Sequence, residues 1–174
     1  DYRRGLLRKC EPNPAHCALA AWGKYLEDFT LVTQNVDGFH TRAGSENIIE
    51  LHGNINRSRC LNCEKRFLMK AEDVPHKPEI CDNCSGKVRP DVVLFGEMLP
   101  LGAYEKALEK AENCDVFFII GTSALVYPAA ILPEAAKQNG AYLVEINPEE
   151  TPITHFCDES LCGKAGDILP NLLS

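Results

Sequence analysis

The chain has 174 residues, enough for one domain with a buried core. Hydrophobic residues make up 45% and charged residues 25%, the ordinary balance of a globular protein. The net charge of -7 argues against a nucleic-acid partner, because neutralising phosphates needs a basic face, and no apolar run approaches the roughly 20 residues of a membrane-spanning helix.

The first half of the chain predicts two helices followed by short strands. Residues 1–9 are typical of the end of a helix, and a second helix is expected from Pro14 to about residue 28, with Leu19, Trp22 and Leu26 at helical spacing. Residues 30–33 and 48–51 are short apolar runs that indicate buried strands. Residues 56–88 show little apolar periodicity.

The second half alternates strands and helices. Residues 91–95 are briefly apolar, and residues 115–120 form the near-continuous apolar run of a central parallel strand. Helices are predicted over 104–112, 129–139 and about 167–173, with a further strand over 141–146. This alternation predicts an α/β fold with a Rossmann-like, doubly wound parallel sheet.

Two Cys-x-x-Cys pairs, Cys60/Cys63 and Cys81/Cys84, stand 17 residues apart. Four thiolates fill the tetrahedral shell of a structural Zn²⁺ and leave no position for water. Two disulfides or a redox pair are the alternatives. The chain has 9 cysteines, an odd number with irregular spacing outside these pairs, which favours a reducing environment and zinc.

Three further positions could carry chemistry. Gly121-Thr122-Ser123 follows the central strand, and Asn147 ends the next one, so both fall where open α/β sheets bind ligands. His52 follows a strand end and could act as a general base. The alternatives are an ordinary turn and a loop histidine bonded to backbone. The chain contains no Gly-x-Gly-x-x-Gly fingerprint.

Taken together and in order, six motifs resemble those of the sirtuins, a family of NAD-dependent protein lysine deacylases. They are Thr33-Gln34-Asn35-Val36-Asp37 with His40, His52-Gly53, the four cysteines, Phe95-Gly96-Glu97, Gly121-Thr122-Ser123 and Ile146-Asn147. The resemblance implies a Rossmann-like NAD-binding domain over 1–55 and 89–174, and a small zinc-binding module inserted over 56–88. Substrates would bind in the cleft between them.

The resemblance also implies a mechanism. The acyl oxygen of a modified lysine attacks the nicotinamide ribose of NAD, nicotinamide leaves, and His52 acts as general base on the ribose hydroxyls. Water completes the transfer to give free lysine and 2′-O-acyl-ADP-ribose. Gln34 and catalytic Asn35 would hold the ribose and the reactive water. The remaining implied cofactor-binding residues are Val36, Asp37, Gly121, Thr122, Ser123, Asn147, Pro148, Glu149 and Ala165.

Acylated peptide substrates are implied to add as a strand beside Val93, Phe95, Gly96 and Tyr127. The segments Tyr2-Arg3-Arg4 and Val126-Tyr127-Pro128-Ala129-Ala130 are similar to the class that prefers succinyl and malonyl groups. There Arg3 would bind the acyl carboxylate, because its planar fork matches that group. The alternative is that Arg3 and Arg4 form a solvated helix face.

The Gly-Ala-Gly segment that grips the NAD pyrophosphate in this family is not among these 174 residues. We therefore expect the first strand of the sheet to be missing and these residues alone to bind NAD poorly. Two other functions stay open, a non-catalytic module that binds acyl-lysine or ADP-ribose, and a mono-ADP-ribosyltransferase. A monomer is expected, in the cytoplasm of a bacterium or in mitochondria if the source is eukaryotic.

Overall fold

The structure is a computed structural model that describes residues 2–68 and 80–172. Its parallel strands fall into two groups. Strand β1 (Leu31–Thr33) pairs with β2 (Ile48–Glu50), and β6 (Val116–Ile120), β7 (Tyr142–Asn147) and β8 (Glu159–Cys162) form a second sheet in that order. The predicted parallel α/β architecture is confirmed. Within the described residues, however, no strand ladder joins the two groups into one sheet.

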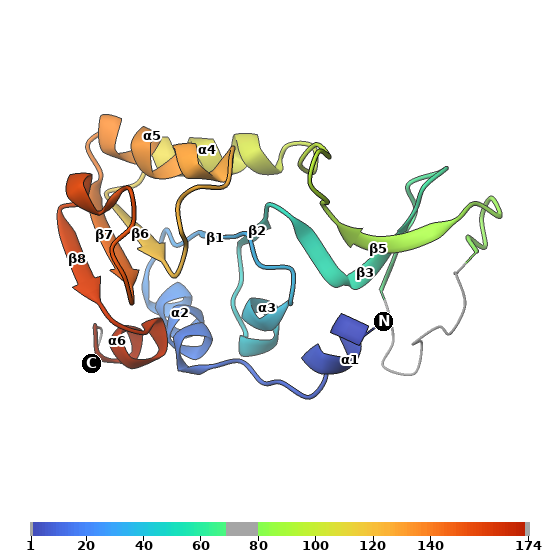
Figure 1. The fold of residues 1–174 in the computed structure, drawn as a ribbon, viewed down its shortest axis with the longest axis horizontal. Helices are drawn as coiled ribbons and strands as arrows, with labels where there is room; N and C mark the ends of the chain where they lie inside the picture. The colour runs from blue at the N-terminus through green and yellow to red at the C-terminus, as the bar shows by residue number, and fades with distance from the viewer. Residues whose placement is uncertain (1, 69–79, 173–174) are drawn as a thin grey trace.

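Helices cover both faces of the parallel strands (Figure 1). Helices α4 (Ala103–Glu112) and α5 (Leu132–Gln138) lie on one face, and α2 (Pro14–Tyr25) and α6 (Ala165–Leu172) lie on the other. Helix α2 begins at Pro14 as predicted, where the Asn13 side chain accepts a hydrogen bond from the amide of His16. It ends three residues earlier than expected, because Leu26 turns to an extended conformation.

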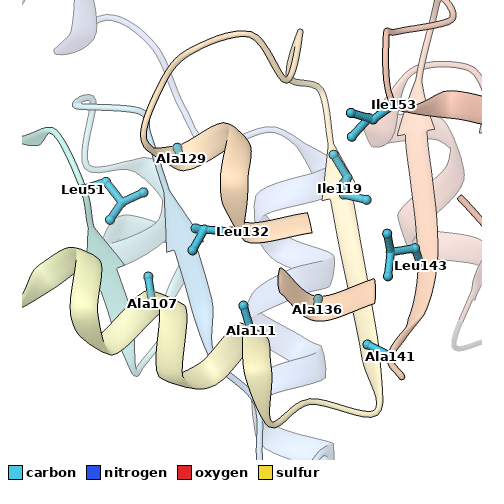
Figure 2. Packing of buried hydrophobic residues seen from close by; sticks show 10 residues of the cluster. All are labelled: Leu51, Ala107, Ala111, Ile119, Ala129, Leu132, Ala136, Ala141, Leu143 and Ile153. Atoms are coloured by element: carbon cyan, nitrogen blue, oxygen red, sulfur yellow. The ribbon is translucent and has the colours of Figure 1, made fainter. Parts of the chain in front are cut away.

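The two faces of β7 supply two separate cores. Leu143 packs with Ile119 of β6 against α4 and α5, while Val144 and Ile146 pack against Trp22 on the opposite face. This alternation follows from the two-residue period of a strand. Figure 2 shows the first of these cores, where small residues of α4 and α5 let the helices approach closely. The alanines concerned are Ala107, Ala111 and Ala136.

The cysteine-bearing insert is built on an antiparallel sheet. Its strands are β3 (Gly53–Cys60), β4 (Arg66–Leu68) and β5 (Val88–Val92), in the order β4-β3-β5. The sheet therefore reaches beyond the predicted bounds 56–88 on both sides, and residues 69–79 of that range lie outside the described residues. Strand β3 was not predicted, because its sequence is polar and its buried residues include Asn54 and Ser58.

Helix α1 (Tyr2–Leu7) lies within residues 1–9, where the end of a helix was expected, and the 3-10 turn at Ala129–Ile131 lies within the helix expected over 129–139. Helix α3 (Phe39–Ala43) was not predicted; it has five residues and lies between Gly38 and Gly44, which both adopt positive φ angles. The 3-10 turns at Ala129–Ile131 and Thr154–Phe156 flank α5 and β8. Elements this short cannot display a helical or strand period. Within the described residues, no helix has the length and apolar character needed to cross a membrane.

Candidate functional site

The first part of the site lies where β1 and β2 end. These strands are parallel, so the residues that follow them, Gln34 onward and His52, emerge at the same edge. The amide of Asn35 donates to the Thr33 hydroxyl at 3.1 Å, which starts a tight turn immediately after β1. The loop after β1 and the histidine after β2 are thereby brought together, as the sequence predicted.

A cavity of about 390 Å³ opens beside this edge. Three segments that are distant in the sequence line it, namely α1, the loop after β1 and the start of β3. The lining residues are Arg3, Leu6, Leu7, Gln34, Asn35, Val36, Asp37 and Ile55. Five residues that the sequence marked for cofactor or substrate therefore share one cavity with an apolar wall.

His52 is held in a defined orientation. Its Nδ1 lies 3.1 Å from the backbone carbonyl oxygen of Gln34. A carbonyl can only accept, so Nδ1 carries the hydrogen and Nε2 keeps the lone pair that a general base needs. This orientation is compatible with the predicted role of His52 as a base. The bond to backbone that the competing interpretation expected is also present, and it holds the ring in place.

The backbone around His52 ties the base to the insert. The amide of Val93 donates to the His52 carbonyl at 2.9 Å, which connects the predicted base to a predicted substrate residue. Gly53 follows with φ +76°, and a Cβ there would stand 2.2 Å from the carbonyl oxygen of Asp91. Only glycine fits this approach between β3 and β5.

The loop that lines the cavity is fastened to β3. The amide of Ile55 donates to the Val36 carbonyl at 2.8 Å, and the Asn56 side chain donates to the Asp37 carbonyl at 2.9 Å. The Asp37 carboxylate in turn accepts from the amide of Phe39 at 2.8 Å. The sequence analysis did not identify Asn56 as part of the site. Its hydrogen-bond partner lies 19 residues earlier, and no local sequence pattern connects the two residues.

The neighbouring arginines of α1 have different environments. Arg3 is exposed and lines the cavity. Arg4 is buried and donates to the carbonyls of Ile55 at 2.6 Å and Arg57 at 3.0 Å, and to the Ser58 hydroxyl at 3.0 Å. The alternative of a solvated face formed by both arginines is therefore wrong for Arg4. Its burial fixes α1 against β3 and so places Arg3 at the cavity.

A second part of the site lies at the carboxyl ends of β6, β7 and β8. Gly121 has φ +58°, and the Asn147 side chain donates to the Thr122 carbonyl at 2.9 Å. The amide of Gly163 donates to the Asn147 carbonyl at 3.0 Å. The segments after all three strands are thus bonded together, with Ala165 half-buried at the start of α6. The remaining predicted residues here, Ser123, Pro148 and Glu149, are exposed.

The predicted peptide-binding residues lie on exposed segments. Val93 is half-buried, whereas Phe95 is fully exposed, Gly96 has φ +85° and Tyr127 is 74% exposed. Among the described residues, no hydrogen bond links Tyr127 to the segment 93–96. The side chains of Phe95 and Tyr127 therefore lie in solvent, whereas that of Val93 is partly covered.

Segment 93–97 is held by an ion pair that the sequence did not reveal. Arg89 donates to both carboxylate oxygens of Glu97, at 2.5 and 3.0 Å, and Glu97 also accepts from the amide of Leu94 at 3.0 Å. The bond from Arg89 and then the one from Leu94 lower the pKa of Glu97 to about 2. Glu97 is therefore ionised throughout the physiological range and fixes the segment to β5.

The four cysteines form one cluster. The sulfurs of Cys60 and Cys84 lie 3.5 Å apart, those of Cys63 and Cys81 lie 3.6 Å apart, and all four lie within 4.8 Å of one another. A tetrahedral Zn²⁺ with Zn–S bonds of about 2.3 Å separates its sulfurs by about 3.8 Å. All nine cysteines of the chain are free thiols, so the disulfide alternative is wrong.

The charge on this cluster also fits a cation. Hydrogen bonds, first from the Lys65 amide, lower the pKa of Cys63 to about 6. A backbone bond from Gly86 would lower the pKa of Cys84, but the sulfurs of Cys60 and Cys63 raise it to about 12. Holding all four sulfurs as thiolates at these distances would need a positive centre, and the all-sulfur donor set suits one structural zinc ion.

The profile of the Sir2 family matches residues 2–128. An NAD-dependent protein deacylase of Aquifex aeolicus is 47% identical over 165 residues, which cover 95% of this chain and 69% of that protein.

Solved structures agree with this match. A mutant Sir2 homologue in complex with ADP-ribose is 43% identical, with a TM-score of 0.92 over 97% of this chain and 68% of that one. Sir2Tm bound to a propionylated peptide is 33% identical, with a TM-score of 0.87 over 96% of this chain and 72% of that one. The chain therefore spans about two thirds of the length of these relatives.

Proposed function

This chain belongs to the Sir2 family, and from that premise we propose that the full-length protein is an NAD-dependent protein lysine deacylase. One observation carries the proposal. His52, with a free Nε2, is bonded to the carbonyl of Gln34, a residue that lines the cavity together with Asn35, Val36 and Asp37. A base next to a partly apolar cavity suits an acyl transfer from lysine to a ribose hydroxyl, because the cavity can hold the acyl group while the base accepts the hydroxyl proton.

NAD, when bound, supplies the ribose carbon that accepts the acyl oxygen of the modified lysine and releases nicotinamide. The Gln34 carbonyl keeps the His52 ring oriented, and Nε2 would accept a proton from a ribose hydroxyl. Asn35, which is exposed on the loop after β1, would hold the ribose and the water that completes the transfer. The four cysteines would hold a structural zinc ion in the insert, and because four sulfurs fill its shell the site would leave no position for a reactive water.

The adenosine half of NAD would lie along the second part of the site. Gly121, Thr122 and Asn147 present backbone and amide groups at the ends of β6 and β7, joined by the bond from Asn147 to the Thr122 carbonyl. Exposed Ser123 and Glu149 are available for the ribose. This assignment follows the general rule that ligands of open α/β sheets bind beyond the carboxyl ends of the strands.

The preferred acyl group is proposed to be acidic, such as succinyl or malonyl. Arg3 lies at the cavity wall and, among the described residues, makes no ion pair. An arginine without a carboxylate partner beside an acyl cavity can bind a carboxylate on the substrate. Burial of Arg4 supports the proposal, since it fixes the helix that carries Arg3.

The test is a competition assay on the full-length protein. Equal amounts of acetyl-lysine and succinyl-lysine peptide are incubated with NAD and followed by mass spectrometry. Succinyl should be removed faster, and Arg3→Gln should abolish that preference while acetyl removal continues. Lys9→Gln, a change at an exposed cation outside the cavity lining, is the matched control. Equal rates for both peptides in the unmodified protein would contradict the acidic preference and leave deacylation intact.

Replacement of His52 by Ala distinguishes an enzyme from a binding module. An enzyme loses turnover but keeps ADP-ribose binding, whereas a binding module never turns over NAD with either residue. Transfer of radiolabelled NAD to protein would reveal mono-ADP-ribosyltransferase activity instead. We also propose a monomer in the cytoplasm, or in mitochondria if the source is eukaryotic, which light scattering and cell fractionation would test.

A further inference from the structure

Glu145 is a buried carboxylate in the middle of β7 to which the proposed mechanism assigns no role. It is only 1% exposed, although its neighbours Leu143, Val144 and Ile146 on the strand are all apolar core residues. Burying a carboxylate among apolar side chains is costly unless its oxygens accept hydrogen bonds. Its position therefore requires a specific set of donors.

Three hydroxyl groups supply those donors. Thr151 donates to Oε1 of Glu145 at 2.5 Å, and Thr154 donates to Oε2 at 2.5 Å. Ser160 of β8 donates to Oε2 from 3.5 Å. Among the described residues, no cation lies within ion-pair distance of Glu145. The carboxylate is thus balanced by hydroxyls alone, and two of the three belong to the loop that follows β7.

The two threonines also organise their own loop. The amide of Thr151 donates to the Thr154 hydroxyl at 2.8 Å, and the amide of Ile153 donates to the Thr151 hydroxyl at 3.3 Å. Each hydroxyl accepts from the loop backbone and directs its single proton to Glu145. Glu145 therefore anchors the turn at 151–154 to the sheet through one bond on each carboxylate oxygen.

This anchored turn is directly continuous with residues 147–150. Asn147 ends β7 two residues after Glu145 and donates to the Thr122 carbonyl, while Pro148 and Glu149 are exposed. Segment 147–150 is thus held at one end by β7 and at the other by the turn at 151–154. Loss of the anchor would free the second end only.

We propose that Glu145 is a positioning residue that holds segment 147–150 in the conformation that binds the adenosine half of NAD; this inference rests on the proposed function. Glu145 itself does not touch the cofactor, since it lies inside the sheet. It acts through Thr151 and Thr154, and it lowers the cost of ordering the loop when the ligand binds. Its contribution should therefore appear in nucleotide affinity and not in peptide affinity.

The test uses the full-length protein and the variants Glu145→Gln, Thr151→Val and Thr154→Val. Glutamine at position 145 replaces one carboxylate oxygen by an amide NH₂ group, so one of the two threonine hydroxyls loses its acceptor. Valine at position 151 or 154 removes the hydroxyl group with little change in the shape of the side chain. Ser160→Ala is the matched control, because Ser160 also bonds Glu145 but belongs to β8 and not to the loop.

Isothermal titration calorimetry with ADP-ribose should show affinity weakened about tenfold in the three test variants, the effect of about one hydrogen bond to a charged group. The KM for NAD should rise by a similar factor, with kcat and the KM for peptide unchanged. Ser160→Ala should bind ADP-ribose like the unmodified protein. If Glu145→Gln does not fold, the two threonine variants carry the test.

Unchanged ADP-ribose affinity in the threonine variants would overturn the inference. An equal loss of ADP-ribose affinity in Ser160→Ala would overturn it too. A fall in kcat together with weaker binding of both nucleotide and peptide would show that Glu145 only stabilises the fold, and would also overturn it. Failure of the proposed function is distinguishable, because calorimetry reports nucleotide binding whether or not the protein removes acyl groups. Loss of binding in the threonine variants supports the positioning role even if no deacylation is found.

Discussion

Replacing Gly53 by Ala should disable the site through a single methyl group. The added Cβ would stand 2.2 Å from the carbonyl oxygen of Asp91, and real Cβ atoms do not come closer than about 3.0 Å to such a neighbour. Backbone cannot rotate away as a side chain can, so β3 and β5 must separate where Gly53 pairs with Val92. His52 precedes Gly53 and moves with it.

Two costs add in this variant. An alanine at φ +76° carries the left-handed penalty of about 1–2 kcal/mol. Separating the strands weakens backbone hydrogen bonds that contribute about 1 kcal/mol each. We expect unfolding free energy to fall by about 3 kcal/mol in total. A displacement of the base by about 1 Å should lower kcat/KM about 100-fold.

Gly44→Ala is the matched control for this experiment. Gly44 also has a positive φ, +92°, but a Cβ there meets nothing within 4 Å. It should lose only about 1–2 kcal/mol and keep full activity. Urea unfolding gives the two free energies, and steady-state deacylation gives kcat/KM. Equal stability and equal activity in the two variants would refute the argument that the contact with Asp91 makes Gly53 necessary.

Cys60→Ser should release zinc and unfold the insert, which metal analysis and circular dichroism would measure. Full activity without bound zinc would contradict a structural role for the metal. The lowered pKa of Glu97 means that its pair with Arg89 stabilises the fold above pH 4.5 and that this contribution is lost as pH falls toward about 2. The stability difference between the unmodified protein and Glu97→Gln should therefore shrink over that range in acid unfolding; a constant difference would argue against the pair. Leu143→Ala, at a fully buried site, should cost about 2–5 kcal/mol, while Leu125→Ala, at a 61% exposed site, should cost little in urea unfolding.

Local pattern was sufficient for the elements that bury an apolar face. The run before Gly121 predicted β6, and the spacing from Pro14 onward predicted α2, since strand and helix periods report which side of an element is buried. The spacing of the cysteines likewise predicted one metal site, because two short turns suffice to bring each pair together. The ordered motifs indicated the family that the comparisons confirmed.

Strands with mostly polar residues could not be predicted from local hydrophobic periodicity. Strand β3 runs from Gly53 to Cys60 with few apolar residues, and its stability depends on partners such as Arg4, which lies 51 to 54 residues earlier. A local sequence pattern does not predict which distant hydrogen-bond donor will contact a given buried acceptor. For the same reason the sequence could not show that Arg4 is buried against β3 while Arg3 lines the cavity.

The amino-acid sequence by itself determined the fold class, the zinc ligands and the candidate base, because each depends on local spacing or on an ordered set of motifs. Only the tertiary structure decided how these parts act together. It held the His52 ring against the Gln34 carbonyl, placed α1 along one wall of the cavity, and buried Glu145 beneath the loop after β7. These relations join backbone and side-chain groups across the fold, and their energies exist only once the chain has brought them within hydrogen-bonding distance.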